Sequence, residues 1–275
     1  MLPLLNLPIG PSAVTYDPSQ GGEGVQAYFA DMLLDSDRNA KYYEAIYKTV
    51  QRFKREQRRE PVVLDAGCGT GFLTACALVA GAKTVIAVDV DKSHIDNLPQ
   101  RLGDDYMSRV VAVHINDPSQ GAVPEFDMLI SELLGTFSNS ESAFKYLGQY
   151  AKHMKRHDND AVYTVPHRVT QTVRKFNPIE HVKHEIDRKF ERKYMPTELV
   201  GWLYELAEPT YTDDDAPVLV RGDDFSVYPF ACILHRRELP PGYYVAEWTA
   251  ELCTGVHLSN SWEWAHSQTT DQHSK

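Results

Sequence analysis

A chain of 275 residues with 43% apolar and 24% charged residues is long enough for one large domain or two ordinary ones. The formal net charge of −10 argues against sequence-independent binding of nucleic acid, whose phosphates require a basic surface. No run approaches 18 apolar residues, and the apolar start of the chain lacks a basic segment, so we expect neither a membrane span nor a signal peptide.

The four cysteines, Cys68, Cys76, Cys232 and Cys253, have neither the spacing of a zinc site nor that of a redox pair. We therefore expect reduced thiols, no bound metal and a cytosolic or nuclear protein. Residues 1–27 are rich in Pro, Gly and Ser, and we expect a loose segment there.

The first predicted element is an amphipathic helix over 38–59, where apolar residues recur at helical spacing. Asp35 or Ser36 can cap its start. Five basic residues lie between positions 52 and 59, and we interpret them as a solvated helix end that the helix dipole favours.

A glycine-rich turn follows. Residues 62–71 read Val-Val-Leu-Asp-Ala-Gly-Cys-Gly-Thr-Gly, an apolar strand (62–65) that runs into the turn, and a helix is predicted over 72–80. Strand, glycine turn and helix form the first unit of a nucleotide-binding α/β fold, because glycine allows positive φ and a close approach of a ligand. The next predicted strand, 84–89, ends in Asp89, whose carboxylate can accept hydrogen bonds from two ribose hydroxyls.

The flanking residues discriminate between nucleotides. Phe72 occupies the position of the third glycine in a dinucleotide fingerprint, and no Lys-Ser/Thr pair completes a phosphate loop. Asp65 would repel a phosphate but would suit an ammonium group. The pattern Asp-x-Gly-x-Gly-x-Gly with a strand-end acid resembles motif I of methyltransferases that use S-adenosylmethionine (AdoMet); a dinucleotide oxidoreductase is the alternative.

The α/β alternation continues, with strands predicted over 109–114, 126–131 and 160–165 and helices over 92–102 and 141–155. Strands that alternate with helices indicate a mainly parallel sheet with right-handed crossovers. Ligands bind at the carboxyl ends of such strands. The residues that fall at strand ends, and that we expect to converge on one site, are Gly67 to Gly71, Asp89, Asn116, Asp117 and Glu132.

After Pro166 the pattern changes to a β-rich second domain. A helix is expected over 178–196, and the predicted strands are 168–176, 199–206, 217–220, 225–234 and 243–253. The chain stops about 20 residues after the last of these strands, so we expect a short or truncated second domain.

Two glutamates flank a turn-forming stretch after the fourth strand. Glu132 and Glu141 are separated by Gly135 and Ser-Asn-Ser, which favour a hairpin-like loop over a helix. Two carboxylates held close need a cation between them, and a planar guanidinium fits because it pairs bidentately. The simpler alternatives are that Glu141 caps the following helix and that Glu132 is an ordinary strand-end acid.

Together these motifs resemble the protein arginine methyltransferase family over about residues 27–175. They are Tyr-Phe-x-Asp-Met-Leu at 28–33, Arg38, the loop over 65–71, Asp89 and the paired glutamates. The sequence of residues 30–43 is most similar to that of the type III branch, whose members make monomethylarginine. Ser-Glu-Leu-Leu-Gly at 131–135 is also similar to the symmetric-dimethylating branch.

The resemblance implies a fold, a cofactor and partners. It implies a Rossmann-like AdoMet domain over 28–166 and a β-barrel-like domain over 167–275, with a dimerisation arm at about 176–206. AdoMet would be converted to S-adenosylhomocysteine (AdoHcy). The expected substrates are Arg-rich or Arg-Gly-rich proteins such as RNA-binding proteins or histones, and a homodimer is expected.

The resemblance also implies residue roles. Arg38 would bind the AdoMet carboxylate, Asp89 the ribose, and Glu132 with Glu141 would clamp the substrate guanidinium. The full cofactor set would be Tyr28, Phe29, Met32, Arg38, Asp65, Gly67, Cys68, Gly69, Gly71, Leu73, Asp89, Val90, Asn116, Asp117 and Glu132.

One family motif is missing. The family closes its pocket with a Thr-His-Trp loop, and the nearest counterpart is Ala265-His266-Ser267-Gln268. His266 would then be catalytic and Gln268 would contact the substrate. The departure leaves a non-catalytic AdoMet-binding scaffold, or an AdoMet enzyme with another acceptor, as rival hypotheses.

Overall fold

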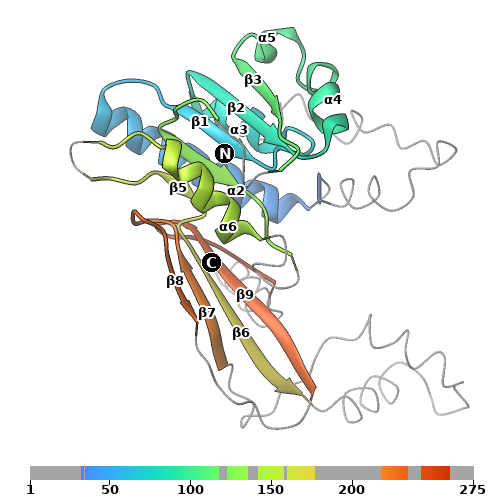
Figure 1. Cartoon of the computed structure of the whole chain (residues 1–275), viewed down its shortest axis with the longest axis vertical. Coiled ribbons are helices and arrows are strands. Elements are labelled where there is room, and N and C mark those ends of the chain that lie inside the picture. The colour runs from blue at the N-terminus through green and yellow to red at the C-terminus, as the bar shows by residue number, and fades with distance from the viewer. Residues whose placement is uncertain are drawn as a thin grey trace, which may run out of the picture. The chain divides into compact units, whose positions relative to one another are not determined.

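The structure, a computed structural model, is shown in Figure 1. It describes residues 32–33, 35–117, 123–135, 142–157, 160–176, 218–234 and 243–260.

The chain divides into two compact units that are not consecutive stretches of sequence. The first comprises residues 1–169, 223–232 and 250–258. The second comprises 170–222, 233–249 and 259–275.

The first unit contains a five-stranded sheet in the order β3-β2-β1-β4-β5, and every neighbouring pair is parallel. This arrangement confirms the predicted Rossmann-like sheet. Helices connect most of its strands, as parallel neighbours require. The strands are β1 (Val62–Ala66), β2 (Thr84–Asp89), β3 (Val110–His114), β4 (Met128–Ser131) and β5 (Thr164–Val165).

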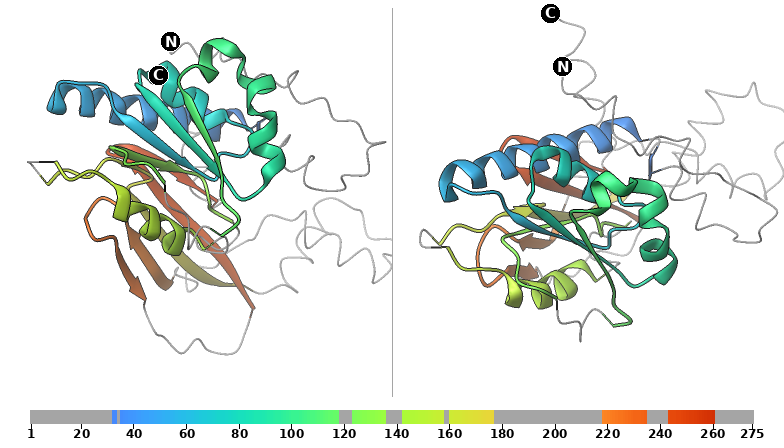
Figure 2. Two further views of the ribbon diagram at one scale, coloured as in Figure 1. Left: turned by 45° about the horizontal axis from the view of Figure 1, so that its top comes forward. Right: turned by 90° about the horizontal axis from the view of Figure 1, so that it is seen from above.

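Helices cover both faces of this sheet, with α2 and α6 on opposite sides (Figure 2). Asp35 caps α2, as predicted, by accepting a hydrogen bond from the backbone N–H of Arg38 at 3.0 Å. The helices are α2 (Ser36–Gln57), α3 (Phe72–Ala80), α4 (Lys92–Leu102), α5 (Asp104–Met107) and α6 (Ala143–Tyr150), and α6 runs into a 3₁₀ turn (Ala151–His153).

The core of the first unit lies around the central strands. β1, β2 and β4 are buried almost throughout, which explains why they read as continuous apolar runs rather than alternating ones. Tyr42, Ile46 and Phe53 line up on one face of α2 and are fully buried. The predicted amphipathic helix therefore contributes its apolar face to this core.

The second sheet has five strands in the order β10-β9-β6-β7-β8. The β-rich character predicted after Pro166 is confirmed, and β6 and β9 have the predicted bounds. One predicted strand, 225–234, is wrong in part: only 231–234 is a strand, and the preceding stretch contains Pro229, which cannot donate to a ladder. The strands are β6 (Arg168–Phe176), β7 (Val218–Asp224), β8 (Ala231–Leu234), β9 (Tyr243–Cys253) and β10 (Val256–Ser259).

β10 was not predicted from the sequence, because its four residues follow β9 after only Thr254 and Gly255. Gly255 has φ +78°, which suits the tight turn of a hairpin. The predicted helix over 178–196, the strand over 199–206 and the arm after residue 176 lie outside the described residues.

Cys68, Cys76 and Cys253 are free thiols. Within the described ranges, no group of three or more His, Cys, Asp or Glu side chains is arranged to hold a metal ion. None of the helices in those ranges has the length and apolar character needed to cross a bilayer.

Candidate functional site

A cavity of about 340 Å³ opens in the first unit at the carboxyl ends of β1, β2 and β4. Its volume is typical of a small-molecule site, and its place in the sheet is where Rossmann-like folds bind ligands. The convergence of strand ends predicted from the sequence is therefore largely confirmed. The lining residues are Met32, Leu33, Arg38, Gly67, Cys68, Gly69, Thr70, Phe72, Leu73, Val88, Asp89, Val90, Asp91, His94, Glu132, Leu133, Tyr146 and Tyr150.

The glycine turn forms one wall of the cavity. The N–H groups of Gly67 and Cys68 both donate to the carbonyl of Val88 at 2.9 Å, which ties the turn to the end of β2. Gly67 has φ +74°, and a Cβ at this position would lie 2.7 Å from Cδ2 of Leu133. A side chain at position 67 would therefore be strained and would displace another cavity residue.

Asp65 does not line the cavity, so the structure does not place it as the partner of a ligand ammonium that the sequence predicted. It lies inside β1, between Ala87 of β2 and Ile130 of β4, and is fully buried. Its Oδ2 accepts a hydrogen bond from the hydroxyl of Thr74 at 2.6 Å. Burial raises the pKa of Asp65 to about 7, so the carboxyl is largely protonated below neutral pH.

Asp89, in contrast, ends β2 and lines the cavity. Its two oxygens accept from the backbone N–H groups of Gly69 and Asp91, each at 2.8 Å, and Nδ1 of His94 lies 3.3 Å from Oδ2. Burial by itself would raise the pKa of Asp89, but these neighbours hold it below its ordinary value. Asp89 is thus a fixed carboxylate with lone pairs left for ligand hydroxyls.

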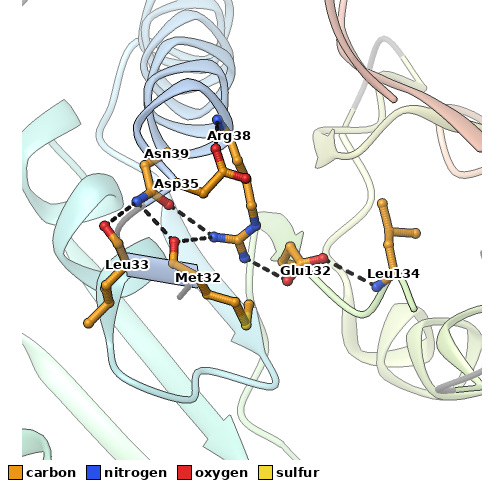
Figure 3. Close-up of polar contacts among 7 residues, drawn as sticks. All are labelled: Met32, Leu33, Asp35, Arg38, Asn39, Glu132 and Leu134. Atoms are coloured by element: carbon orange, nitrogen blue, oxygen red, sulfur yellow. Dashed lines mark hydrogen bonds and ion pairs between the residues drawn. The ribbon is translucent and has the colours of Figure 1, made fainter. Parts of the chain in front are cut away.

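Arg38 and Glu132 form an ion pair across the other part of the cavity (Figure 3). Nη2 of Arg38 lies 2.6 Å from Oε2 of Glu132, and both side chains are largely buried. Burial alone would lower the pKa of Arg38, but the charge of Glu132 raises it overall. The Arg38 guanidinium lies over the ring of Tyr42 at 5.5 Å, and burial raises the pKa of Tyr42 well above its usual range, so this phenol stays neutral.

The structure brings most of the predicted cofactor residues together. Those that line the cavity are Met32, Arg38, Gly67, Cys68, Gly69, Leu73, Asp89, Val90 and Glu132.

Four predicted cofactor residues do not line the cavity: Asp65, Gly71, Asn116 and Asp117. Gly71 faces away from it, since a Cβ there would meet Leu98 of α4. Asn116 is exposed and follows β3, which is an edge strand of the sheet.

The remaining predicted site residues lie outside the described residues: Tyr28, Phe29, Glu141, His266 and Gln268. The pairing of Glu132 with Glu141 therefore stays a prediction. Residues 132–135 have no regular secondary structure, which agrees with the predicted loop after Glu132.

The cavity residues that were not predicted from the sequence include His94, Tyr146 and Tyr150. The two tyrosines are four residues apart on α6, so they share one face, and this spacing was a usable signal. Burial, together with the charge of Asp89, raises the pKa of Tyr150 to about 12. His94 is in the first turn of α4, and no sequence pattern marked its approach to Asp89.

Comparisons with known proteins find similar chains. Residues 63–157 match the family model described as a methyltransferase domain. Over 164 residues the chain is 35% identical to Protein arginine N-methyltransferase 7 of Mus musculus, a match that covers 56% of this chain and 22% of the mouse protein. It is 39% identical over 115 residues to Protein arginine N-methyltransferase 2 of Dictyostelium discoideum, covering 41% of this chain and 21% of that protein. The chain thus spans less than a quarter of the length of these curated relatives.

Solved structures show the same fold. The Trypanosoma brucei PRMT1 enzyme–prozyme heterotetrameric complex with AdoHcy aligns with a TM-score of 0.56 at 19% identity, over 85% of this chain and 77% of that one. Arabidopsis thaliana protein arginine methyltransferase 10, in an open conformation, aligns with a TM-score of 0.50 at 21% identity, over 73% of this chain and 63% of that one. The chain therefore has the Rossmann-like methyltransferase fold followed by a β-rich domain.

Proposed function

We propose that this chain is an AdoMet-dependent methyltransferase that acts on arginine side chains of proteins. The observation that carries the proposal is the Glu132 carboxylate, which lies in the wall of the ligand cavity and already binds a guanidinium, that of Arg38, at 2.6 Å. The sequence similarity of the chain to protein arginine methyltransferases supports the same assignment.

The residues present fit AdoMet. Its amino-acid carboxylate requires a cation, its ribose an acceptor, and its adenine an apolar wall. Arg38 supplies the cation and Asp89 the acceptor, while Val90, Leu133 and Tyr146 supply largely apolar lining. When bound, AdoMet supplies an electrophilic methyl group on a sulfonium.

Glu132 is the residue that we assign to the substrate guanidinium. A carboxylate offers about four lone-pair sites. Oε2 binds Arg38, whereas among the described residues Oε1 receives a long contact, 3.4 Å, from the N–H of Leu134, and we assign Oε1 to accept from a second guanidinium. A carboxylate that draws positive charge onto the nitrogens it binds leaves the remaining terminal nitrogen richer in electrons.

Transfer then needs orientation more than acid–base chemistry. The free terminal nitrogen of the substrate would take the methyl group from the sulfonium of AdoMet, with AdoHcy as the leaving group, and would lose its extra proton after the new carbon–nitrogen bond forms. We assign Glu132 and Glu141 to the clamp and His266 and Gln268 to the substrate side of the pocket.

The finer assignments follow the resemblance to the type III branch. We propose that the product is ω-N-monomethylarginine, that the substrates are Arg-rich or Arg-Gly-rich proteins, and that the chain acts as a homodimer in the cytoplasm and nucleus. Symmetric dimethylation and a non-catalytic AdoMet-binding role are the alternatives that the experiment below separates.

The test is to incubate the purified full chain with methyl-labelled AdoMet and an Arg-Gly-rich peptide, hydrolyse the peptide and identify the methylated amino acid. We expect monomethylarginine alone after exhaustive reaction. Dimethylarginine would keep the reaction and reject the type III assignment. Bound AdoMet without any methylated product would reject catalysis by this chain.

A further inference from the structure

Asn39 is a buried polar side chain next to the cavity that the proposed reaction does not use. It lies at the end of the first turn of α2 and is 7% exposed, and it is not one of the lining residues. A buried amide is costly unless its polar atoms are hydrogen-bonded. Its bonds therefore show what holds it in place.

The Asn39 amide joins two parts of the site (Figure 3). Its Nδ2 donates to the carbonyls of Met32 at 3.2 Å and Leu33 at 2.9 Å, and both of these residues line the cavity. Its Oδ1 accepts from Nη1 of Arg38 at 2.9 Å. Since carbonyls only accept and a guanidinium only donates, the partners fix which end of the amide is oxygen and which is nitrogen.

These hydrogen bonds fix the orientation of the Arg38 guanidinium. Nη1 is held by Asn39 and, more weakly, by the carbonyl of Met32 at 3.5 Å. Nη2, which with Nε forms the opposite edge of the guanidinium, contacts Glu132. That edge has further N–H groups for a ligand carboxylate, because a guanidinium carries five donors in a fixed plane.

We propose that Asn39 is a positioning residue for the cofactor: it fixes Nη1 of Arg38 so that the Nη2–Nε edge faces Glu132 and the amino-acid carboxylate of AdoMet. The proposal rests on the proposed function. An arginine side chain has several rotatable bonds, and anchoring one terminal nitrogen removes most of that freedom before the ligand arrives. The same amide holds residues 32–33 against α2.

The test compares two ligands that differ in the amino-acid group, whose carboxylate Arg38 would bind. AdoHcy carries the amino-acid carboxylate, whereas 5′-methylthioadenosine has the adenosine and thioether but no amino acid. Titration calorimetry on the full chain gives both affinities for the wild type and for Asn39→Ala. We expect Asn39→Ala to weaken AdoHcy binding about tenfold, the scale of one charge-assisted hydrogen bond, and to change methylthioadenosine binding by less than about twofold.

Thr49→Ala is the matched control. Thr49 is another buried polar residue of α2, but its hydroxyl donates to the carbonyl of Ala45 in the same helix, at 2.8 Å. This variant should leave the ratio of the two affinities unchanged. An Asn39→Ala variant that loses both ligands equally, or neither, overturns the positioning role, because a merely structural residue would not distinguish them.

A second variant keeps the test decisive if Asn39→Ala does not fold. Asn39→Asp keeps an acceptor for Arg38 but brings a charge that competes with the ligand carboxylate and removes the donors to residues 32–33. We expect it also to lose AdoHcy selectively, with a higher KM for AdoMet and a smaller change in kcat. Wild-type chain that binds neither ligand would reject the cofactor assignment itself, which is a different result from equal loss in the variant.

Discussion

At the scale of single residues, two aspartates of opposite character lie on adjacent strands, one buried inside the sheet and one in the wall of the cavity. Asp65 lies inside β1 without exposure, and its pKa is raised to about 7 by burial. Asp89 ends the neighbouring strand and receives two backbone N–H bonds, which with His94 lower its pKa. One strand thus carries a carboxyl that is largely protonated below neutral pH, and the next ends in a carboxylate that lines the cavity.

The pH dependence of stability should show the state of Asp65. Its pKa is about 7 in the folded chain and about 3.9 in an unfolded one, so the stability it contributes is present below pH 4 and is lost as pH rises through 7, by up to about 4 kcal/mol. The free energy of unfolding of Asp65→Asn should therefore rise relative to the wild type between pH 5 and pH 8. If denaturant titrations show that the free energies of unfolding of the two proteins change with pH in the same way, then Asp65 is ionised in the folded chain.

Glu132→Gln tests the residue assigned to the substrate. The amide is nearly isosteric but carries no charge, so we expect kcat to fall about 100-fold or more while AdoHcy affinity stays within a few-fold. Glu125→Gln, at an exposed position before β4, is the control and should retain full activity. If Glu132→Gln instead loses AdoHcy binding, then Glu132 binds the cofactor and not the substrate.

At the scale of elements, α2 links the two ends of the first sheet. Its start carries the Arg38 and Asn39 pair described above. Past its far end Arg59 binds Asp127 through two contacts of 2.7 Å, and Asp127 also accepts from the N–H of Val62. The basic end of the helix is therefore not simply solvated, as its sequence indicated: one of its cations neutralises a fully buried carboxylate.

The glycine turn offers a prediction at this scale. Gly67→Ala places a side chain at φ +74° and 2.7 Å from Leu133, whereas Gly255→Ala meets a similar φ of +78° with no atom within 4 Å. Both variants share the backbone cost of about 1–2 kcal/mol, and only Gly67→Ala adds about 1–3 kcal/mol of steric strain. Thermal unfolding should show the larger loss for Gly67→Ala, together with weaker AdoHcy binding. Equal losses would mean that Leu133 moves aside freely.

At the scale of the whole molecule, the charge balance bears on the choice of substrate. The net charge of −10 attracts cationic peptides through solvent, and salt screens that attraction. Raising the salt from about 50 to about 500 mM should increase KM for an Arg-rich peptide several-fold and KM for AdoMet less than about twofold. If steady-state kinetics show that both KM values change by the same factor, then salt acts on the protein as a whole and not on its encounter with the peptide.

Local sequence determined the scaffold of the site. Residues 62–80 contain a strand, a glycine turn and a helix, each of which is recognisable from a few neighbouring residues. The length of the next strand, β2, places Asp89 at its end. For this reason the parallel sheet, the turn and Asp89 could all be predicted. The period-2 pattern at 168–176 and the length of 243–253 likewise identified β6 and β9 with their bounds.

Tertiary structure decided which side chains meet. Arg38 and Glu132 are 94 residues apart, and nothing local indicates that they pair. The motif around Asp65 predicted that its carboxylate contacts the ligand. Instead, the strands on either side of β1 bury Asp65, and the hydroxyl of Thr74 donates a hydrogen bond to it. Asn39, His94 and the two tyrosines of α6 enter the site only because helices pack over the strand ends. Backbone patterns depend on neighbours in sequence, whereas burial and pairing depend on neighbours in space, and those are set only when the layers pack.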